Sequence, residues 1–247
     1  MVPLSVVIIT FNEARNIGRC IDSVQAIADE IVVVDSFSTD QTEAICREKG
    51  ARFVQHAFEG HIEQKNWALT QAHYPHVLSL DADEALSPAL LESIQKVKQT
   101  WAFDAYSMNR RTNYCGQWIW YSGWYPDRKL RLFDRRKGSW GGQNPHDKVA
   151  MQPGITVQWI KGDLLHYSYY TVEEHYERAK KYAQIAALAR QQQGKRSWWV
   201  QVFLSPLAKF IRNYVIKRGF LDGKAGLTIA WISALETYWK YASRPKS

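Results

Sequence analysis

Cysteines, long apolar runs and N-terminal basic residues are all scarce in this sequence. The 247 residues include three cysteines, Cys20, Cys46 and Cys115, whose odd number and wide spacing favour a reducing compartment over a disulfide framework or a zinc site. The longest apolar run, residues 225–235, is well short of the roughly 18 residues that span a bilayer. No basic residue precedes the first strand-like run, so we expect no secretory signal and a cytoplasmic protein.

Two nucleotide-binding signatures are also missing. No G-x-G-x-x-G follows the first expected strand, and G-x-x-x-x-G-K-[ST] does not occur, which argues against dinucleotide oxidoreductases and P-loop enzymes. Hydrophobic residues make up 46% of the chain and charged residues 23%, which excludes a disordered or fibrous protein.

Positive charge is concentrated at one end. From Tyr176 onward the chain has 14 lysines and arginines against 3 acidic residues, a net charge of +11, whereas residues 1–175 carry −3. The basic character therefore belongs to the C-terminal segment and needs its own explanation.

The first half alternates between two kinds of segment. Short β-branched runs cover residues 4–10, 30–35, 52–55 and 76–80, and segments with helical spacing cover 13–26, 39–49 and 61–73. Apolar runs of this length indicate strands buried on both faces, and their alternation with helices predicts an α/β fold with a largely parallel sheet.

Polar clusters follow three of these strands, in residues 10–13, 35–40 and 81–84. Parallel α/β sheets bind ligands beyond the carboxyl ends of their strands, so we expect a binding site there. Asp81 and Asp83 are suited to Mg²⁺ or Mn²⁺, although Asp83 could instead cap the next helix. Asp35 could accept from a base or ribose, or cap a helix, and Lys65 could reach a diphosphate or face solvent.

The second half has a different organisation. We expect a helix over 88–100, then short strands and long loops over 106–147. Thr171 and Glu174 form a capping-box pattern that predicts a helix start, and a second amphipathic helix is expected over 198–215. We therefore predict two parts, a catalytic domain over 1–170 and a basic, aromatic-rich helical segment over 171–247.

Several of these segments resemble a known family. Residues 6–13 (VVIITFNE), 31–42, 64–69 (QKNWAL) and 80–84 (LDADE) resemble family-2 glycosyltransferases in the expected order. Residues 123–128 (GWYPDR), 130–133 (LRLF) and 219–223 (GFLDG) are similar to a narrower branch, which contains the bacterial lipopolysaccharide inner-core β-glucosyltransferases. The resemblance covers nearly the whole chain.

This resemblance implies a GT-A fold, a Rossmann-like sheet flanked by helices with a C-terminal helical appendage, and inverting transfer from a UDP-sugar, with glucose as the sugar. Its motifs assign the uridine to Thr10, Asn12, Glu13 and Asp35. Lys65 would approach the diphosphate, and Asp81 the ribose. Asp83 and His166 would hold a divalent metal, Mg²⁺ or Mn²⁺, with a purely structural His166 as the alternative.

The base of an inverting transfer must be a carboxylate that takes the proton of the acceptor hydroxyl. Related sequences place a Glu after a His where this chain has His146 and Asp147, so Asp147 is the expected base although it is one methylene shorter. Asp127 is the second candidate. Alternatively, Asp147 is simply paired with Lys148 or Arg131.

The expected partners are a UDP-sugar, a lipid-linked saccharide acceptor and an anionic membrane surface. Twelve aromatic residues accompany the basic residues from Tyr176 onward, a composition that suits a membrane interface, at the inner face of the bacterial inner membrane. A nucleic-acid-binding protein is an alternative, but it lacks a recognition motif, and we expect no nucleic-acid partner. A catalytically silent scaffold is the other alternative, disfavoured by Asp81, Asp83 and Asp147.

Overall fold

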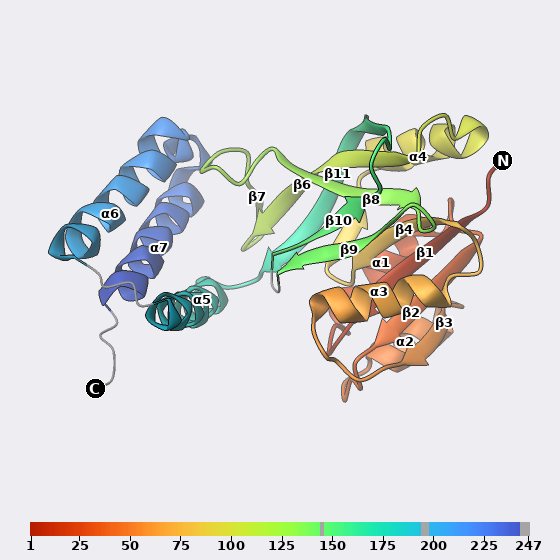
Figure 1. Cartoon of the computed structure of the whole chain (residues 1–247), viewed down its shortest axis with the longest axis horizontal. Helices are drawn as coiled ribbons and strands as arrows, with labels where there is room; N and C mark the ends of the chain where they lie inside the picture. The colour runs from red at the N-terminus through yellow and green to blue at the C-terminus, as the bar shows by residue number, and fades with distance from the viewer. Residues whose placement is uncertain (144–145, 194–197, 243–247) are drawn as a thin grey trace. The chain divides into compact units, whose positions relative to one another are not determined.

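The computed structural model describes residues 1–143, 146–193 and 198–242 (Figure 1). Contacts divide the chain into two compact units. Unit 1 comprises Met1–Arg110 and Asp127–His166, and unit 2 comprises Arg111–Pro126 and Tyr167–Ser247. The sequence predicts residues 111–126 as part of the catalytic domain, whereas the contacts place this segment with the C-terminal helices.

Unit 1 is built on a mixed sheet with the order β3-β2-β1-β4-β8-β6-β11-β5. The first four strands are parallel, and β8 and β6 continue the sheet in antiparallel fashion. The strand bounds are β1 Leu4–Thr10, β2 Glu30–Asp35, β3 Arg52–Gln55, β4 His76–Asp81, β5 Glu84–Leu86, β6 Ala105–Tyr114, β8 Asp127–Asp134 and β11 Val157–Tyr169. A separate hairpin pairs β9 (Gly138–Gln143) with β10 (His146–Met151).

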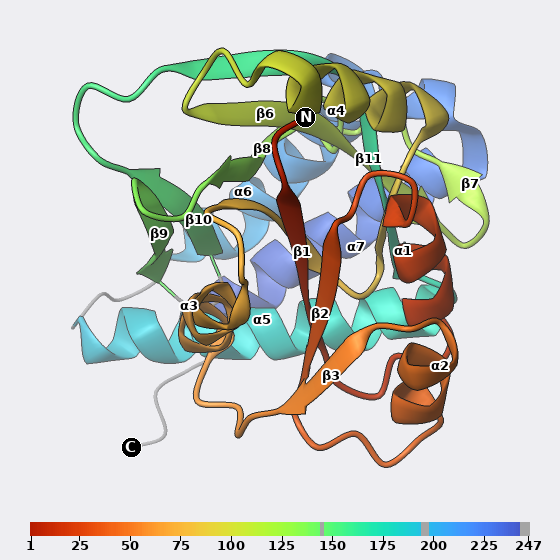
Figure 2. The same ribbon diagram turned by 90° about the vertical axis from the view of Figure 1, so that its right-hand side faces the viewer.

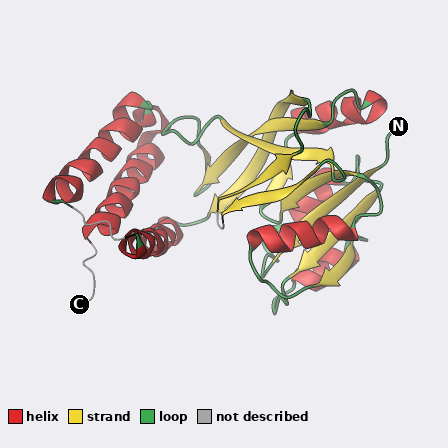
Figure 3. Cartoon of the chain, viewed as in Figure 1, coloured by secondary structure: helices red, strands yellow, loops and turns green. Residues whose placement is uncertain are grey.

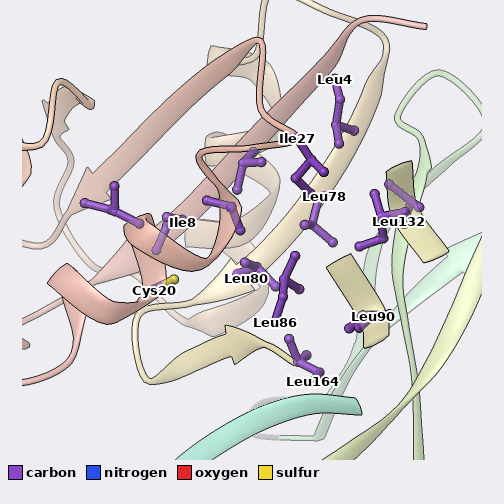
Figure 4. Close-up of a cluster of buried hydrophobic side chains, with 14 of the residues drawn as sticks. Leu4, Ile8, Cys20, Ile27, Leu78, Leu80, Leu86, Leu90, Leu132 and Leu164 are labelled. Atoms are coloured by element: carbon purple, nitrogen blue, oxygen red, sulfur yellow. The ribbon is translucent and has the colours of Figure 1, made fainter. Parts of the chain in front are cut away.

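Helices cover both faces of the parallel strands, as Figure 2 shows. On one face, side chains of α1 (Ile17–Val24), α2 (Thr42–Glu48) and α4 (Pro88–Thr100) bury a cluster around Leu4, Ile8 and Leu80 (Figure 4). On the other face, α3 (His61–Gln71) packs against Val7, Val32 and Val34. Alternate residues of β1 enter the two clusters, because side chains along a strand point to opposite faces.

Unit 2 consists of helices and the segment Arg111–Pro126, which contains the short β7 (Gln117–Trp118) (Figure 3). Helices α5 (Val172–Gln192) and α6 (Trp199–Ile211) both pack on α7 (Gly223–Ala242). Between α6 and α7 lie a π-helical turn, Arg212–Ile216, and a 3₁₀ turn, Gly219–Asp222. Among the described residues, none of the helices combines the length and the apolar composition needed to cross a bilayer.

The predicted α/β class is confirmed, and the expected bounds of β1, β2, β3 and α4 agree with the structure. The capping box at Thr171 and Glu174 is also present. Two helices begin later than expected: α1 begins at Ile17 rather than at 13, and α2 at Thr42 rather than at 39. Polar loop residues precede both helices, and their side chains bond to the neighbouring loop instead of continuing a helix.

Candidate active site

The loops that follow β1 and β2 are joined through Asn12. Thr10 and Asp35 are partners in the register of β1 and β2, so the two loops leave the sheet side by side. The Asn12 N–H donates to Ser38 Oγ (2.7 Å), and the Asn12 side-chain oxygen accepts from the Thr39 N–H (2.8 Å). Asn12 has a φ of 52°, a left-handed conformation that Asn tolerates better than most residues. The two loops therefore form one hydrogen-bonded rim.

Asp35 is fully buried at the end of β2. Its carboxylate accepts from the Ser38 N–H (2.7 Å) and from the Ser38 hydroxyl. At the start of α2 the Thr42 N–H donates to Asp40 (3.0 Å) and not to Asp35. Glu13 lies on the same rim, where its N–H donates to Thr42 Oγ1 (2.9 Å), and Thr10 Oγ1 is buried without a partner among the described residues.

Lys65 connects two of the predicted site carboxylates. Its side chain is 4% exposed on α3, and its ammonium lies 2.9 Å from Asp81 Oδ1 and 2.7 Å from Asp147 Oδ2. The ammonium also lies 4.3 Å from the centroid of the Trp140 ring, a cation–π distance. A buried lysine is stable only when it is paired, and two carboxylates serve that purpose here. Lys65 is thus held at the carboxyl end of β4, not in solvent.

Arg131 of β8 also binds Asp81, the carboxylate that it shares with Lys65. It is buried and donates to Asp81 Oδ2 (3.0 Å) and to the fully buried Glu84 Oε1 (2.8 Å). Burial opposes the charge on Arg131, but Glu84 and Asp81 outweigh this and raise the pKa of the guanidinium. Burial likewise opposes ionisation of Asp81, yet Lys65 and Arg131 hold the pKa of this carboxyl well below its usual range. Asp81 is therefore an ionised group fixed between two cations.

Asp83 and His166 form a second pair. Antiparallel pairing of β11 with β5 places His166 opposite Glu84, and His166 Nε2 lies 3.2 Å from Asp83 Oδ2. His166 Nδ1 is buried, and nothing in the described part of the chain forms a hydrogen bond with it. Across residues 1–143, 146–193 and 198–242, no group of three or more His, Cys, Asp or Glu side chains is placed to hold a metal. Within the described residues, this pair brings together one carboxylate oxygen and one imidazole nitrogen, both atom types that can bind a metal.

The two candidates for the base have different partners. Asp147 forms an ion pair with Lys65 (2.7 Å). Of the alternatives that the sequence suggested, Arg131 interacts with Asp147 electrostatically but donates its hydrogen bonds to Asp81 and Glu84. Asp147 lies in β10 opposite Gly142 of β9. Asp127 is bound instead by Arg110 (2.9 Å) and Lys129 (3.1 Å). Asn144 and Pro145, which precede this segment, lie outside the described residues.

Two residues at this site, Arg131 and Trp140, were not predicted to serve it, and Glu84 was predicted only as a member of the polar cluster 81–84. Trp140 is buried beneath Lys65, where its ring N–H donates to Ser79 Oγ (3.2 Å) and its backbone exchanges two hydrogen bonds of 2.9 Å with the Asn66 side chain. A signal for Arg131 was present in the sequence. An arginine inside the apolar run Leu130–Phe133 is expected to be buried, and a buried arginine requires an acidic partner. Glu84 is a candidate for this partner, because it directly follows a buried strand and an acidic turn.

Chemically, the arrangement offers charge of both signs at one edge of the sheet. A carboxylate–imidazole pair can bind a divalent cation, a buried ammonium can meet a phosphate, and a nearby carboxylate can take a proton. Acceptor groups on the adjoining rim can bind the N–H and O–H groups of a nucleoside. These are the elements of group transfer from a nucleoside diphosphate.

Comparisons with known proteins agree with this chemistry. The profile of glycosyl transferase family 2 matches residues 5–160. The lipopolysaccharide core biosynthesis glycosyltransferase LpsC of Rhizobium meliloti is 30% identical over 99% of this chain and 95% of its own length. An uncharacterised glycosyltransferase of Rickettsia typhi is 28% identical over 98% of this chain and 86% of its own.

A solved structure has the same fold. S. aureus TarS superposes with a TM-score of 0.51 at 17% identity, covering 96% of this chain, and this chain spans 54% of the TarS chain. The profile match, the full-length similarity to LpsC and the GT-A-like architecture together show that this chain belongs to glycosyltransferase family 2 and is a glycosyltransferase.

Proposed function

We propose that this protein is an inverting glycosyltransferase that moves glucose from UDP-glucose to a saccharide of the lipopolysaccharide core or a related envelope glycolipid. The observation that carries the proposal is the grouping of Asp81, Lys65 and Asp147 at the carboxyl end of β4, in a family-2 chain. LpsC, which is named for lipopolysaccharide core biosynthesis, supports the acceptor class. The inner-core branch motifs support glucose as the donor sugar.

The rim formed by the loops after β1 and β2 is the proposed uridine site. Thr10, Asn12, Glu13 and Asp35 line the ends of these two strands, and the Asn12 bonds to Ser38 and Thr39 fix the rim before any ligand arrives. A preformed rim reduces the conformational entropy that is lost when the ligand binds. Asp81 would accept from the ribose, and Lys65 would face the diphosphate as a compact positive charge.

Asp83 and His166 are the proposed metal ligands. Their oxygen and nitrogen lie 3.2 Å apart, and both atom types coordinate divalent cations such as Mn²⁺ and Mg²⁺. Since the described residues supply only this pair, the remaining positions would fall to diphosphate oxygens and water. When bound, the cation would stabilise the negative charge on the departing diphosphate.

Asp147 is the proposed base. In an inverting transfer the acceptor oxygen attacks the anomeric carbon while the bond from that carbon to the UDP oxygen breaks, and its electron pair leaves with UDP. The acceptor hydroxyl proton would pass to Asp147. In the structure the Lys65 ammonium donates to Asp147 Oδ2 (2.7 Å). A diphosphate that attracts Lys65 would release this oxygen, so we infer that donor binding prepares the base.

A donor screen tests the proposed function. Purified enzyme is incubated with deacylated lipopolysaccharide core oligosaccharide, Mn²⁺ and UDP-glucose, UDP-galactose or UDP-N-acetylglucosamine, and UDP release is measured. We expect UDP-glucose to give the fastest release, dependent on the acceptor. Faster turnover with another donor would contradict the assignment of glucose, and release without any acceptor would contradict transfer to the core.

We further propose that α6 attaches the enzyme to an anionic membrane surface. No residue of α6 is buried, and Trp199, Phe203 and Leu207 recur every four residues along it with 55–68% of their surface exposed. This spacing forms an apolar stripe on one face. Exposed Arg212, Lys217 and Arg218 follow the helix and would attract anionic lipids, whereas Lys209 is half-buried and burial lowers the pKa of its ammonium. Lys195 and Arg196 lie outside the described residues.

Replacing Trp199 and Phe203 by serine should release the protein from anionic vesicles in a co-sedimentation assay, because it removes two large insertion groups. Wild type should bind anionic but not zwitterionic vesicles, and added salt should weaken binding. The matched control is Ile185→Ser with Leu188→Ser, which removes exposed apolar residues from α5 and should leave binding intact. Wild type that remains in the supernatant at low salt would contradict membrane attachment.

A further inference from the structure

The segment Arg111–Pro126 of unit 2 carries an unusual concentration of aromatic side chains. Trp118, Trp120, Tyr121 and Tyr125 lie within eight residues, and the active site described above uses none of them. Trp120 is 47% exposed and Tyr121 36% exposed. Exposed aromatic rings close together are characteristic of binding surfaces, because water is displaced from them at low cost.

A buried carboxylate holds this segment in place. The two oxygens of Asp222, in the 3₁₀ turn before α7, accept from the Trp120 and Tyr121 N–H groups at 3.0 Å each. The Ser122 hydroxyl donates to the same carboxylate (3.2 Å), and the Gln117 side chain donates to the Asp222 carbonyl (2.9 Å). Charge-assisted hydrogen bonds of this kind are among the stronger ones in proteins. The backbone that bears Trp120 and Tyr121 is therefore fixed.

Close backbone packing beneath the segment reinforces this fixation. A Cβ on Gly226 would lie 1.8 Å from the Gly219 carbonyl oxygen, so only glycine allows α7 to meet the 3₁₀ turn. Ile119, directly before Trp120, is fully buried with Tyr114 and Ile229. The motif GFLDG, residues 219–223, thus helps to hold the backbone of the segment Arg111–Pro126 in place.

The rings themselves are oriented by one arginine. The guanidinium carbon of Arg111 lies 4.3 Å from the centroid of the Trp120 ring and 5.2 Å from that of Trp118. The Trp120 ring also meets Tyr125 edge-on, with centroids 5.2 Å apart. Cation–π and edge-to-face contacts restrict ring orientation, so the exposed Trp120 ring is held in a defined orientation. We name Arg111, Trp118, Trp120, Tyr121 and Tyr125 the aromatic platform.

We propose that the aromatic platform binds a pyranose ring of the saccharide acceptor, with Trp120 as the stacking surface. The apolar C–H face of a pyranose lies flat against an indole ring, and its hydroxyl groups stay at the edge, where polar side chains and water can reach them. A site of this kind is largely aromatic with few polar groups, as small-ligand sites are. Exposed Lys217 and Arg218 add positive charge beside the segment, since the Ser122 N–H donates to the Lys217 carbonyl (3.1 Å).

A saccharide fits these observations better than a lipid surface does. Insertion into a membrane requires exposed apolar area but no defined ring orientation. In the platform, Arg111 restricts the orientation of the rings and Asp222 fixes the backbone. Such pre-organisation raises the affinity for a ligand of defined shape, because less entropy is lost on binding. This inference rests on the proposed acceptor class and deepens it by naming where the acceptor is recognised.

Kinetics of the full-length enzyme with deacylated core oligosaccharide test the platform, because no membrane is involved. We expect Trp120→Ala to raise the acceptor KM by about tenfold, with the donor KM within about twofold of wild type. Trp120→Tyr, which keeps a flat ring, should recover most of the loss. The matched control is Trp231→Ala, which removes a 58% exposed tryptophan of α7 and should leave both KM values unchanged.

A direct titration separates failure of the platform from failure of the proposed function. Saturation-transfer NMR with the deacylated oligosaccharide reports binding without turnover and should give a weaker signal with Trp120→Ala than with wild type. That result would support the platform even if UDP-glucose proved to be the wrong donor. An unchanged acceptor KM and titration for Trp120→Ala, or an equal effect of Trp231→Ala, would overturn the inference. Reduced vesicle binding with unchanged oligosaccharide binding would reassign Trp120 to the membrane.

Discussion

Replacing Asp147 by asparagine is expected to lower kcat by at least about 10²-fold while the affinity for UDP-sugar stays close to that of wild type. The amide keeps the shape of the side chain and can still accept from Lys65, but it cannot take a proton from the acceptor hydroxyl. Lys65 retains its ion pair with Asp81, so the donor-side charges remain in place. Steady-state kinetics of UDP release and a UDP-sugar titration measure the two quantities separately.

Two further substitutions decide between the carboxylates. Asp147→Glu keeps a carboxylate, one methylene longer, and should retain more activity than Asp147→Asn. Asp127→Asn is the matched control, because Asp127 is an acidic residue bound by Arg110 and Lys129 rather than by Lys65. A larger loss of kcat in Asp127→Asn than in Asp147→Asn would make Asp127 the base. Normal kcat with weaker UDP-sugar binding in Asp147→Asn would place Asp147 in the donor pocket.

The parallel part of the fold was predictable because its signals are local. β-branched runs that are mostly apolar specify buried strands, and β1 and β2 have the bounds that the sequence predicted. The starts of α1 and α2 were not predictable in this way. Glu13 and Asp40 could belong to a helix by spacing alone. In the structure they join the two loops, because the Glu13 N–H donates to Thr42 and Asp40 accepts from the Ala14 N–H.

The site was predicted as a set of residues but not as a network. Asp81, Lys65 and Asp147 were named separately, and nothing in the sequence indicates that one buried ammonium bridges two carboxylates 66 residues apart. Long-range pairs of this kind depend on the tertiary fold. The aromatic platform was hidden for the same reason, because Asp222 lies about a hundred residues after the backbone that it holds.

The structure adds exposed apolar residues to the features that favour the predicted membrane-interface role of the C-terminal segment. In the sequence, this role rests on a net charge of +11 together with the aromatic residues of the same segment. The structure adds that exposed apolar side chains gather on α6, and that one of the basic residues, Lys209, is half-buried. Apolar insertion and electrostatic attraction would therefore act together in the membrane proposal, with α6 as its centre.

Replacing Asp83 by alanine is expected to abolish transfer, a loss of at least about 10³-fold in kcat. Stabilisation of the leaving diphosphate by a metal contributes several kcal/mol, and each 1.36 kcal/mol is a factor of ten in rate. The fold should be unaffected, because Asp83 is paired with His166 at the edge of the site and does not belong to the buried core. EDTA should inactivate wild type, and added Mn²⁺ should restore it.

Mn²⁺ binding measured by electron paramagnetic resonance gives a readout that does not depend on turnover. With UDP present, wild type should bind Mn²⁺, and both Asp83→Ala and His166→Ala should bind it more weakly, because each removes one of two protein ligands. Asp22→Ala is the matched control: it removes an exposed carboxylate paired with Lys49 and should change neither Mn²⁺ binding nor rate. Full activity of wild type in excess chelator would disprove the metal assignment. Loss of activity in Asp83→Ala with unchanged Mn²⁺ binding would instead assign Asp83 to the donor sugar, since a carboxylate at this position would then act by accepting from sugar hydroxyls.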